Sequence, residues 1–388
     1  MKKKIAIVTA TRAEYGLLLP IIKKIINQNI LEVKLVVTGA HLSPEFGMTI
    51  HEIEKENLKI DKKIDILLAS NTSVGVSKSM GLALIGFAEY FDESKPDAVM
   101  ILGDRYEMLA VASAALNARI PIIHLHGGET TEGAVDEAIR HAITKMSYLH
   151  FTSTESYRNR VIQLGENPER VFNVGAMGIE NALRVEKITK GELEQSIGYS
   201  LGDKYAVGTF HPVTLENETA EEQIDQLIEA MKEFPSIKFL FTKANADVNG
   251  RIINQRLLEC AKQMDNIVLI DNLGTKLYLN AIRMASFVIG NSSSGIIEVP
   301  AFHVPTVNIG DRQKGRIQSK SVINCKEQKE DIIRAIKKAM SEEFLKSIEK
   351  VKSAYGDGNT SDQIVEIITK WICNTYIDLK KKFYDISI

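Results

Sequence analysis

Two short segments bring together side chains that can exchange protons. The sequence HLHGGE at 124–129 follows an apolar run, and DEAIRH at 136–141 has helical spacing. Imidazoles and carboxylates can act as acids and bases near neutral pH. A structural ion-pair network would explain the charges of these segments but not their histidines and paired glycines. We therefore expect a catalytic cluster here, in which His124 and His126 lie on the same face of a strand.

The paired histidines also raise the question of a metal site, because imidazoles bind zinc in hydrolytic enzymes. No further ligand group lies at a recognisable metal spacing. Cys260, Cys325 and Cys373 are scattered and form no CxxC pair. We expect neither a metal nor a disulfide, and no cysteine nucleophile.

A third segment, NSSSG at 291–295, is suited to binding an anion. It lies between an apolar run and a helical pattern. Small hydroxyl residues and free N–H groups at a helix N-terminus suit a diphosphate, so Ser292 and Ser293 are candidate contacts, with helix capping as the alternative. We place Glu298 one turn inside that helix, where it could bind two ribose hydroxyls. Arg312, in the basic loop 310–316, is another candidate anion contact.

Charged residues follow three other apolar runs. Arg12 follows the first run and could clamp a phosphate at a helix start, although a surface arginine fits the sequence equally well. Asp104 and Arg105 follow the run at 98–102, where an aspartate is a general base or, more commonly, a helix cap. His211 follows the run at 205–210. The chain has neither GxGxxG nor GxxxxGK[ST], so we expect no bound cofactor such as NAD and no P-loop nucleotide.

The pattern of apolar runs predicts the elements that position these residues. Short runs alternate with helical patterns, which is typical of parallel sheets covered by helices. The pattern restarts after a polar stretch, so we expect two Rossmann-like α/β domains, 1–175 and 176–360. We expect these domains to face each other across a cleft. A terminal helix in 361–388 could pack back on the first domain. The expected strands are 5–8, 33–37, 98–102, 120–124, 149–151, 205–210, 237–241, 267–270, 287–289 and 306–309.

Composition excludes several other classes of protein. The 388 residues carry a net charge of −2 and no long basic block, which argues against nucleic-acid binding. No apolar segment is long enough for a membrane span or a signal peptide. We therefore expect a cytoplasmic protein without a membrane partner.

Together, these segments resemble the hydrolysing UDP-N-acetylglucosamine 2-epimerases of sialic-acid pathways. The resemblance spans nearly the whole chain in the family's order. The matching stretches are 11–13, 103–105, 127–129, 136–145, 211–213, 290–293 with Glu298, 312–313 and 315–316.

The resemblance implies a GT-B arrangement of two Rossmann-like domains, with UDP held mainly by the second. It also implies that a base removes the C2 proton as UDP leaves, and that water then adds to the glycal, without a redox cofactor. By carry-over, Asp104 and Asp136 are the best acid/base candidates, and His211 is a catalytic or phosphate-side group. With His126 and Glu129 they make up the candidate catalytic set. The substrate contacts would be Arg12, Arg105, Asn245, Ser292, Ser293, Glu298 and Arg312. Families of this kind usually form homodimers or homotetramers.

One position departs from many relatives of the family. They carry a glutamate where this chain has His126, and one more residue separates Glu129 from Asp136 here. An imidazole could take over the proton transfer.

Three other functions remain open for the chain. They are a UDP-N,N′-diacetylbacillosamine 2-epimerase of legionaminic-acid synthesis, a GT-B glycosyltransferase that shares the UDP site, and a non-catalytic UDP-sugar sensor.

Overall fold

In the computed structural model, the chain contains two parallel sheets, each with its own core. The structure describes residues 2–44, 47–68, 72–130, 135–212, 220–244, 250–374 and 377–386. Unit 1 contains Met1–Glu129, Val135–Glu180 and Gly356–Ile388, and unit 2 contains Asn181–Tyr355. The predicted α/β class with two Rossmann-like sheets is confirmed.

The sheet of unit 1 has the strand order β3-β2-β1-β4-β5-β6-β7, and every pair is parallel. Ile5 of β1 lies opposite Val33 of β2 on one side and Ala98 of β4 on the other. The strands are β1 (Lys4–Thr9), β2 (Glu32–Thr38), β3 (Ile60–Ile64), β4 (Ala98–Leu102), β5 (Ile122–Leu125), β6 (Leu149–Thr152) and β7 (Val171–Asn173).

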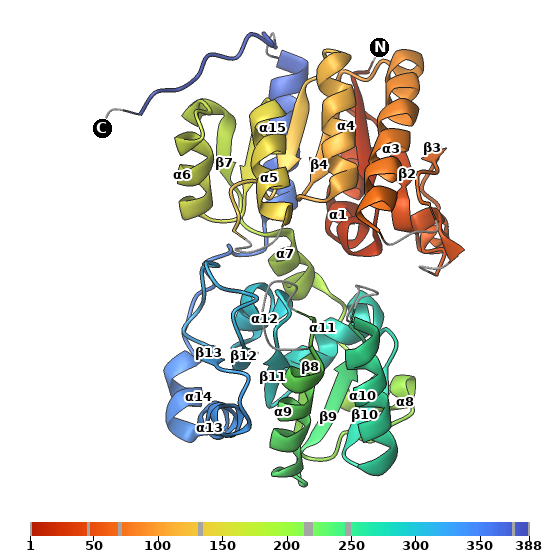
Figure 1. Cartoon of the computed structure of the whole chain (residues 1–388). Coiled ribbons are helices and arrows are strands. Elements are labelled where there is room, and N and C mark those ends of the chain that lie inside the picture. The colour runs from red at the N-terminus through yellow and green to blue at the C-terminus, as the bar shows by residue number, and fades with distance from the viewer. Residues whose placement is uncertain are drawn as a thin grey trace. The chain divides into compact units, whose positions relative to one another are not determined.

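Helices cover both faces of this sheet (Figure 1). Alternate residues of β1 belong to different cores: Ile5 and Ile7 pack with α1 and α15, whereas Ala6 and Val8 pack with α3 and α4. A strand buried on both faces must be apolar throughout, which explains the apolar run. The helices are α1 (Arg12–Gln28), α2 (Ile50–Lys55), α3 (Ser73–Ser94), α4 (Tyr106–Asn117), α5 (Val135–Met146), α6 (Glu155–Gln163) and α15 (Thr360–Asn374).

The helix α7 (Met177–Arg184) spans the passage from unit 1 to unit 2, and the chain returns to unit 1 at Gly356. The last helix, α15, then packs against α1. Its start is held by Glu180, whose carboxylate accepts the backbone N–H of Ser361 at 2.6 Å. No helix within the described ranges is long and apolar enough to cross a membrane.

Unit 2 repeats the architecture with the strand order β10-β9-β8-β11-β12-β13, again all parallel. Its strands are β8 (Tyr205–Thr209), β9 (Lys238–Thr242), β10 (Ile267–Ile270), β11 (Phe287–Gly290), β12 (Thr306–Ile309) and β13 (Val322–Cys325). Its helices are α8 (Lys190–Ile197), α9 (Ala220–Lys232), α10 (Gly250–Gln263), α11 (Gly274–Met284), α12 (Ser294–Ile297), α13 (Lys329–Ala339) and α14 (Glu342–Ile348). One core packs under α9, α10 and α13, and the other under α8 and α11.

Candidate active site

Each sheet reverses its strand order at one point, and most candidate residues lie beside that point. In unit 1 the reversal falls between β1 and β4, whose carboxyl ends lead into Arg12 and into Asp104. In unit 2 it falls between β8 and β11, which lead into His211 and into Ser292. Open parallel sheets bind ligands at such points, because the loops diverge there and leave a crevice. In each unit, taken by itself, the topology therefore favours a ligand contact at this point of the sheet.

A buried arginine organises the acidic residues of unit 1. Arg140, on α5, is only 2% exposed. Its Nη1 donates to the backbone oxygen of Glu129 at 2.7 Å and to Glu137 Oε2 at 2.8 Å, and its Nη2 forms an ion pair with Asp104. A buried guanidinium is stable only with such partners. These bonds therefore fix Asp104 relative to the loop that follows β5.

His126 lies in that loop with its imidazole tied to Glu129. The strand β5 ends at Leu125 and His126 has a φ of 63°, so the prediction that His124 and His126 share one face of a strand is wrong. His126 Nδ1 lies 2.9 Å from Glu129 Oε1, which also accepts the hydroxyl of Ser153 at 2.8 Å. The other ring nitrogen, Nε2, is buried and has no hydrogen-bond partner within the described part of the chain. With Nδ1–H donating to the carboxylate, Nε2 carries a lone pair that can accept a proton.

His124 has a structural role instead. It is fully buried, its Nε2–H donates to the carbonyl of Gly103 at 2.8 Å, and Nδ1 lies 3.3 Å from the Thr144 hydroxyl. Burial lowers the pKa of His124 to about 3, so the ring stays neutral. Its bond to Gly103 holds the loop that carries Asp104.

A buried carboxylate, Glu14, connects the loops after β1 and β4. Glu14 Oε2 accepts the backbone N–H groups of Ala10 at 2.9 Å and Thr11 at 3.3 Å, which forms a capping box at the start of α1. Glu14 Oε1 lies 3.9 Å from Arg105 Nε. Arg105 in turn makes two bonds, of 3.1 and 3.0 Å, to the carboxylate of Glu107. Burial raises the pKa of Glu14 to about 7.

Arg12 and Asp136 are more exposed. Arg12 Nη1 lies 3.6 Å from Glu52 Oε1, and about a third of its side chain is exposed. Asp136 lies in the first turn of α5. Desolvation by the surrounding protein and then the negative charge of Asp104 raise the pKa of Asp136, while Arg105 opposes the shift. Asp104 and Asp136 thus belong to one electrostatic group.

In unit 2, the side chain of Asn291 joins the loops after β8 and β11. Its Oδ1 accepts the backbone N–H of His211 at 2.7 Å, and its Nδ2 donates to the carbonyl of His211 at 2.8 Å. The carbonyl of Asn291 accepts Arg312 Nη1 at 3.1 Å and Gln313 Nε2 at 2.9 Å. These bonds hold His211 and Arg312 at the same end of the sheet. Burial, and then the charge of Arg312, lowers the pKa of His211 to about 3, so its imidazole is neutral at physiological pH.

The serine loop after β11 leads into a short helix. Ser293 makes no side-chain capping bond within the described residues, whereas the Ser292 hydroxyl accepts the backbone N–H of Ser294 at 3.4 Å, so the capping alternative applies to Ser292. The helix α12 spans Ser294–Ile297, and Glu298 is its C-terminal cap, with helical dihedral angles and its N–H donating to the carbonyl of Ser294 at 3.0 Å. Glu298 thus lies one turn after the start of the helix, at its end rather than in its interior. The segment 299–302 continues as a 3₁₀ turn that contains Pro300, which cannot extend an α-helix.

Several residues that position the candidate loops were not proposed from the sequence. Asn245 lies outside the described residues. The residues not proposed from the sequence are Glu14, Glu107, Ser153, Asn291 and Gln313. Only Glu14 had a local signal, because Thr11-x-x-Glu14 is a capping-box pattern.

Comparison with known proteins agrees with this description. The family model for UDP-N-acetylglucosamine 2-epimerase matches residues 23–369. The GDP/UDP-N,N′-diacetylbacillosamine 2-epimerase (hydrolyzing) of Campylobacter jejuni is 44% identical over 99% of this chain and 100% of its own length. Polysialic acid biosynthesis protein P7 of Escherichia coli is 43% identical over 99% of this chain and 98% of its own length.

A solved structure supports the fold. That of a putative UDP-N-acetylglucosamine 2-epimerase from Listeria monocytogenes superposes with a TM-score of 0.82 at 18% identity and covers 100% of both chains. The resemblance drawn from the motifs is thereby confirmed over nearly the whole length of the sequence. The chain belongs to the UDP-N-acetylglucosamine 2-epimerase family.

Proposed function

We propose that the protein is a hydrolysing 2-epimerase that converts UDP-N-acetylglucosamine and water into N-acetylmannosamine and UDP. Membership of the family and the similarity to relatives named as hydrolysing 2-epimerases support this proposal. The observation that carries it is the His126 imidazole, whose Nδ1 contacts a buried carboxylate and whose Nε2 has no hydrogen-bond partner among the residues that the structure describes. A buried ring with one unbonded nitrogen is suited to proton transfer.

The first step would remove the C2 proton while the bond between C1 and the UDP oxygen breaks, which leaves a glycal. The second step would add hydroxide from water to C1 and a proton to C2 on the opposite face. This sequence needs one acid and one base on opposite sides of the ring. We assign these roles to His126, supported by Glu129, and to the pair Asp104 and Asp136. The raised pKa of Asp136 is consistent with a group that holds a proton more readily than an ordinary aspartate.

We assign the diphosphate to the loops of unit 2. The hydroxyls of Ser292 and Ser293, the guanidinium of Arg312 and the neutral imidazole of His211 are all donors that can bind phosphate oxygens. They would stabilise the negative charge that develops on UDP as it leaves. Arg12 and Arg105 are proposed as further substrate contacts from unit 1. Glu298 and Asn245 remain predicted contacts of the ribose and of the substrate.

A second substrate deserves a parallel test. Two of the similar relatives are named as N,N′-diacetylbacillosamine 2-epimerases, at 44% and 34% identity. The name of the first gives the nucleotide as GDP/UDP and that of the second as UDP. N,N′-diacetylbacillosamine differs from N-acetylglucosamine at C4 and C6 only, so the chemistry at C1 and C2 would be the same.

The experiment is to incubate the protein with each UDP-sugar in D₂O and to follow the products by NMR. The proposal predicts free UDP and a 2-epimerised free sugar that carries deuterium at C2. A glycosyltransferase would instead need an acceptor and would release no free epimer, and a sensor would release no UDP. The better substrate is the one with the higher kcat/KM.

The catalytic assignment has its own test. His126→Ala should lower kcat by roughly 10²- to 10⁴-fold, the usual contribution of a general acid or base. The control is His51→Ala, since His51 is a surface histidine with a side chain 65% exposed. Unchanged turnover in His126→Ala would refute the role of His126 and leave the overall reaction to be judged by its products.

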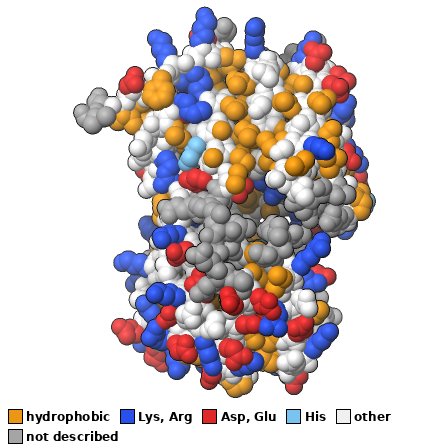
Figure 2. Space-filling model, in the orientation of Figure 1, with side chains coloured by type: hydrophobic (Ala, Val, Ile, Leu, Met, Phe, Trp, Pro, Cys, Tyr) orange, Lys and Arg blue, Asp and Glu red, His pale blue; other side chains and the backbone are white. Residues whose placement is uncertain are grey.

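We also infer that the protein is a homo-oligomer, either a dimer or a tetramer. The helix α3 exposes Val74, Leu82 and Ile85 at 61%, 42% and 60%. Figure 2 shows hydrophobic side chains gathered on the face of unit 1 where α3 and α4 lie. Apolar surface gathered in this way is typical of a protein interface.

A further inference from the structure

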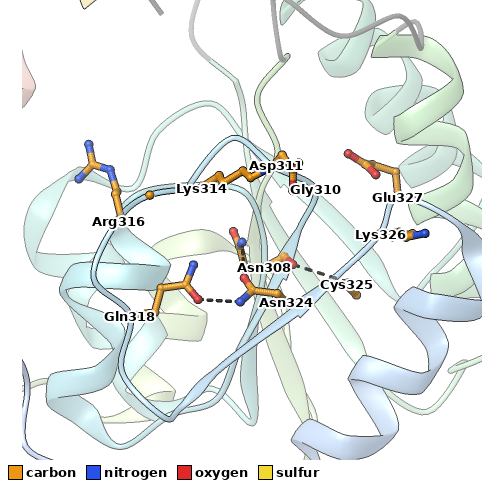
Figure 3. Close-up of a pocket in the computed structure, with 11 residues that line it drawn as sticks. Asn308, Gly310, Asp311, Lys314, Arg316, Gln318, Asn324, Cys325, Lys326 and Glu327 are labelled. Carbon is orange, nitrogen blue, oxygen red and sulfur yellow. Dashed lines mark hydrogen bonds and ion pairs between the residues drawn. The ribbon is translucent and has the colours of Figure 1, made fainter. Parts of the chain in front are cut away.

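A polar cavity of about 790 Å³ lies in unit 2 at the carboxyl ends of β12 and β13 (Figure 3). Its walls are the end of β12, the loop 310–318 and the segment 324–327. Sites for small molecules usually measure roughly 300–1,000 Å³. The volume therefore suits a monosaccharide derivative or a compound of similar size.

Positive side chains outnumber negative ones on the walls of this cavity. Lys314, Arg316 and Lys326 line it together with Asp311 and Glu327. Lys314 Nζ lies 3.2 Å from Asp311 Oδ2 and is partly neutralised by it. The positive side chains would attract an anionic group on a ligand.

A row of amides lines the same cavity. Asn308 Nδ2 donates to Asn324 Oδ1 at 2.8 Å, and Asn324 Nδ2 donates to Gln318 Oε1 at 2.6 Å (Figure 3). Amide groups both donate and accept, as sugar hydroxyls do, so they can bind a polyhydroxylated ring. The combination of amides and cations is suited to a sugar that carries a carboxylate or a phosphate.

The loop beside the cavity also reaches the proposed diphosphate site. Arg312 and Gln313 bond to the carbonyl of Asn291 after β11, whereas Lys314 and Arg316 line the cavity. Two buried oxygens, Asn308 Oδ1 before this loop and Gln313 Oε1 within it, have no hydrogen-bond partner among the described residues. A buried polar atom without a hydrogen bond raises the free energy of the folded state. A different conformation of the loop that gives these oxygens a hydrogen bond would recover part of that free energy.

We propose that this cavity binds a sugar bearing one carboxylate or phosphate group, and that its occupancy changes the affinity for UDP through the loop 310–316. The second part rests on the proposed role of Arg312 in binding the diphosphate. The ligand would act as an effector, because its site and the diphosphate site lie on different parts of one loop. By linkage, UDP must change the affinity for the sugar by the same factor.

The binding test uses three probes with one ring skeleton: glucose 6-phosphate, glucuronate and glucose. Titration calorimetry with saturating UDP keeps the nucleotide site occupied. We expect at least one anionic probe to bind and glucose not to bind, and the better probe identifies the anionic group.

Variants locate the binding in the cavity. Lys326→Ala and Gln318→Ala should each weaken it about three- to tenfold, as expected for the loss of one polar or ionic contact at a partly exposed site. The control is Lys320→Ala, an exposed lysine outside the cavity lining. Equal melting temperatures would show that the variants are folded. The absence of binding by both anionic probes, or binding that neither cavity variant weakens, would overturn the site.

The coupling is measured as the Kd of UDP with and without the bound probe. A change of about fivefold or more is expected for two linked sites. Equal affinities would overturn the coupling but not the cavity. If UDP fails to bind at all, the proposed function fails, and titration of the probes without UDP still tests the cavity by itself.

Discussion

The carboxyl group of Glu14 gives unit 1 a stability that depends on pH in a predictable direction. Burial raises its pKa from 4.5 to about 7, against the opposing effects of Arg105 and the backbone N–H groups. The folded state therefore binds this proton more tightly than the unfolded state. This proton adds about 3 kcal/mol to the free energy of unfolding below about pH 4.5. The contribution is lost as the pH rises to about 7.

The variant Glu14→Gln removes this titration and keeps an oxygen that can accept from Ala10 and Thr11. The free energy of unfolding of the wild type should therefore fall by about 2–3 kcal/mol relative to the variant between pH 5 and pH 8. Urea denaturation followed by tryptophan fluorescence suits this measurement. The single tryptophan, Trp371, lies on α15 in unit 1, with its ring 5.9 Å from that of Tyr148, so its signal reports on this unit.

The matched control is Glu366→Gln, since Glu366 lies on the exposed surface of α15 in the same unit. It should leave the pH dependence of unfolding as in the wild type. A constant difference between wild type and Glu14→Gln across the pH range would refute the reasoning. It would mean that the carboxyl group titrates alike in the folded and unfolded states.

Three further predictions concern other parts of the chain. Arg140→Lys keeps the charge, but a lysine cannot bond to all three partners of the guanidinium, so Asp104 should be misplaced. We expect kcat, measured as steady-state UDP release, to fall roughly a hundredfold. An unchanged kcat would contradict this prediction. Gly290→Ala should lower the free energy of unfolding of unit 2 by about 3 kcal/mol, because Gly290 has a φ of 129° and an added Cβ would collide with the carbonyl of Thr209. Denaturation followed by circular dichroism would measure this loss. A variant as stable as the wild type would refute the predicted collision. Ile85→Asp should convert the oligomer to monomers in light scattering, and an unchanged mass would exclude this face of α3 as the interface.

The strands that the sequence predicts are mostly those whose residues are buried on both sides. On β1, the residues from Ile5 to Val8 are all fully buried, so the strand reads as an unbroken apolar run. The strands not predicted, β3, β7 and β13, all lie at sheet edges. The edge strand β3 carries exposed Lys62 and Lys63, which hide it from a search for apolar runs. Periodicity thus detects the centre of a parallel sheet better than its margins.

The same distinction applies to the candidate site. The loops were predictable because in parallel sheets the carboxyl ends of strands carry the ligand contacts. The bonds between those loops were not, because they join residues far apart in the chain: 36 residues separate Asp104 from Arg140, and 80 separate His211 from Asn291. No local pattern records such pairings. Pro300, in contrast, was a local sign that the helix after Ser293 would stop early.

The pairing of His126 with Glu129 offers a physical reason why an imidazole can stand where many relatives have a carboxylate. Glu129 is 5% exposed, and its Oε1 is held by both the Ser153 hydroxyl and His126 Nδ1. The carboxylate accepts the Nδ1–H of the ring, which fixes the tautomer and leaves the lone pair on Nε2. Glu129 would then act by positioning His126, whose role in proton transfer is proposed above. On this reasoning Glu129→Gln should lower kcat even though its side chain need not touch the sugar, because a neutral amide oxygen is a weaker acceptor than a carboxylate. An unchanged kcat in steady-state assays of UDP release would contradict this positioning role.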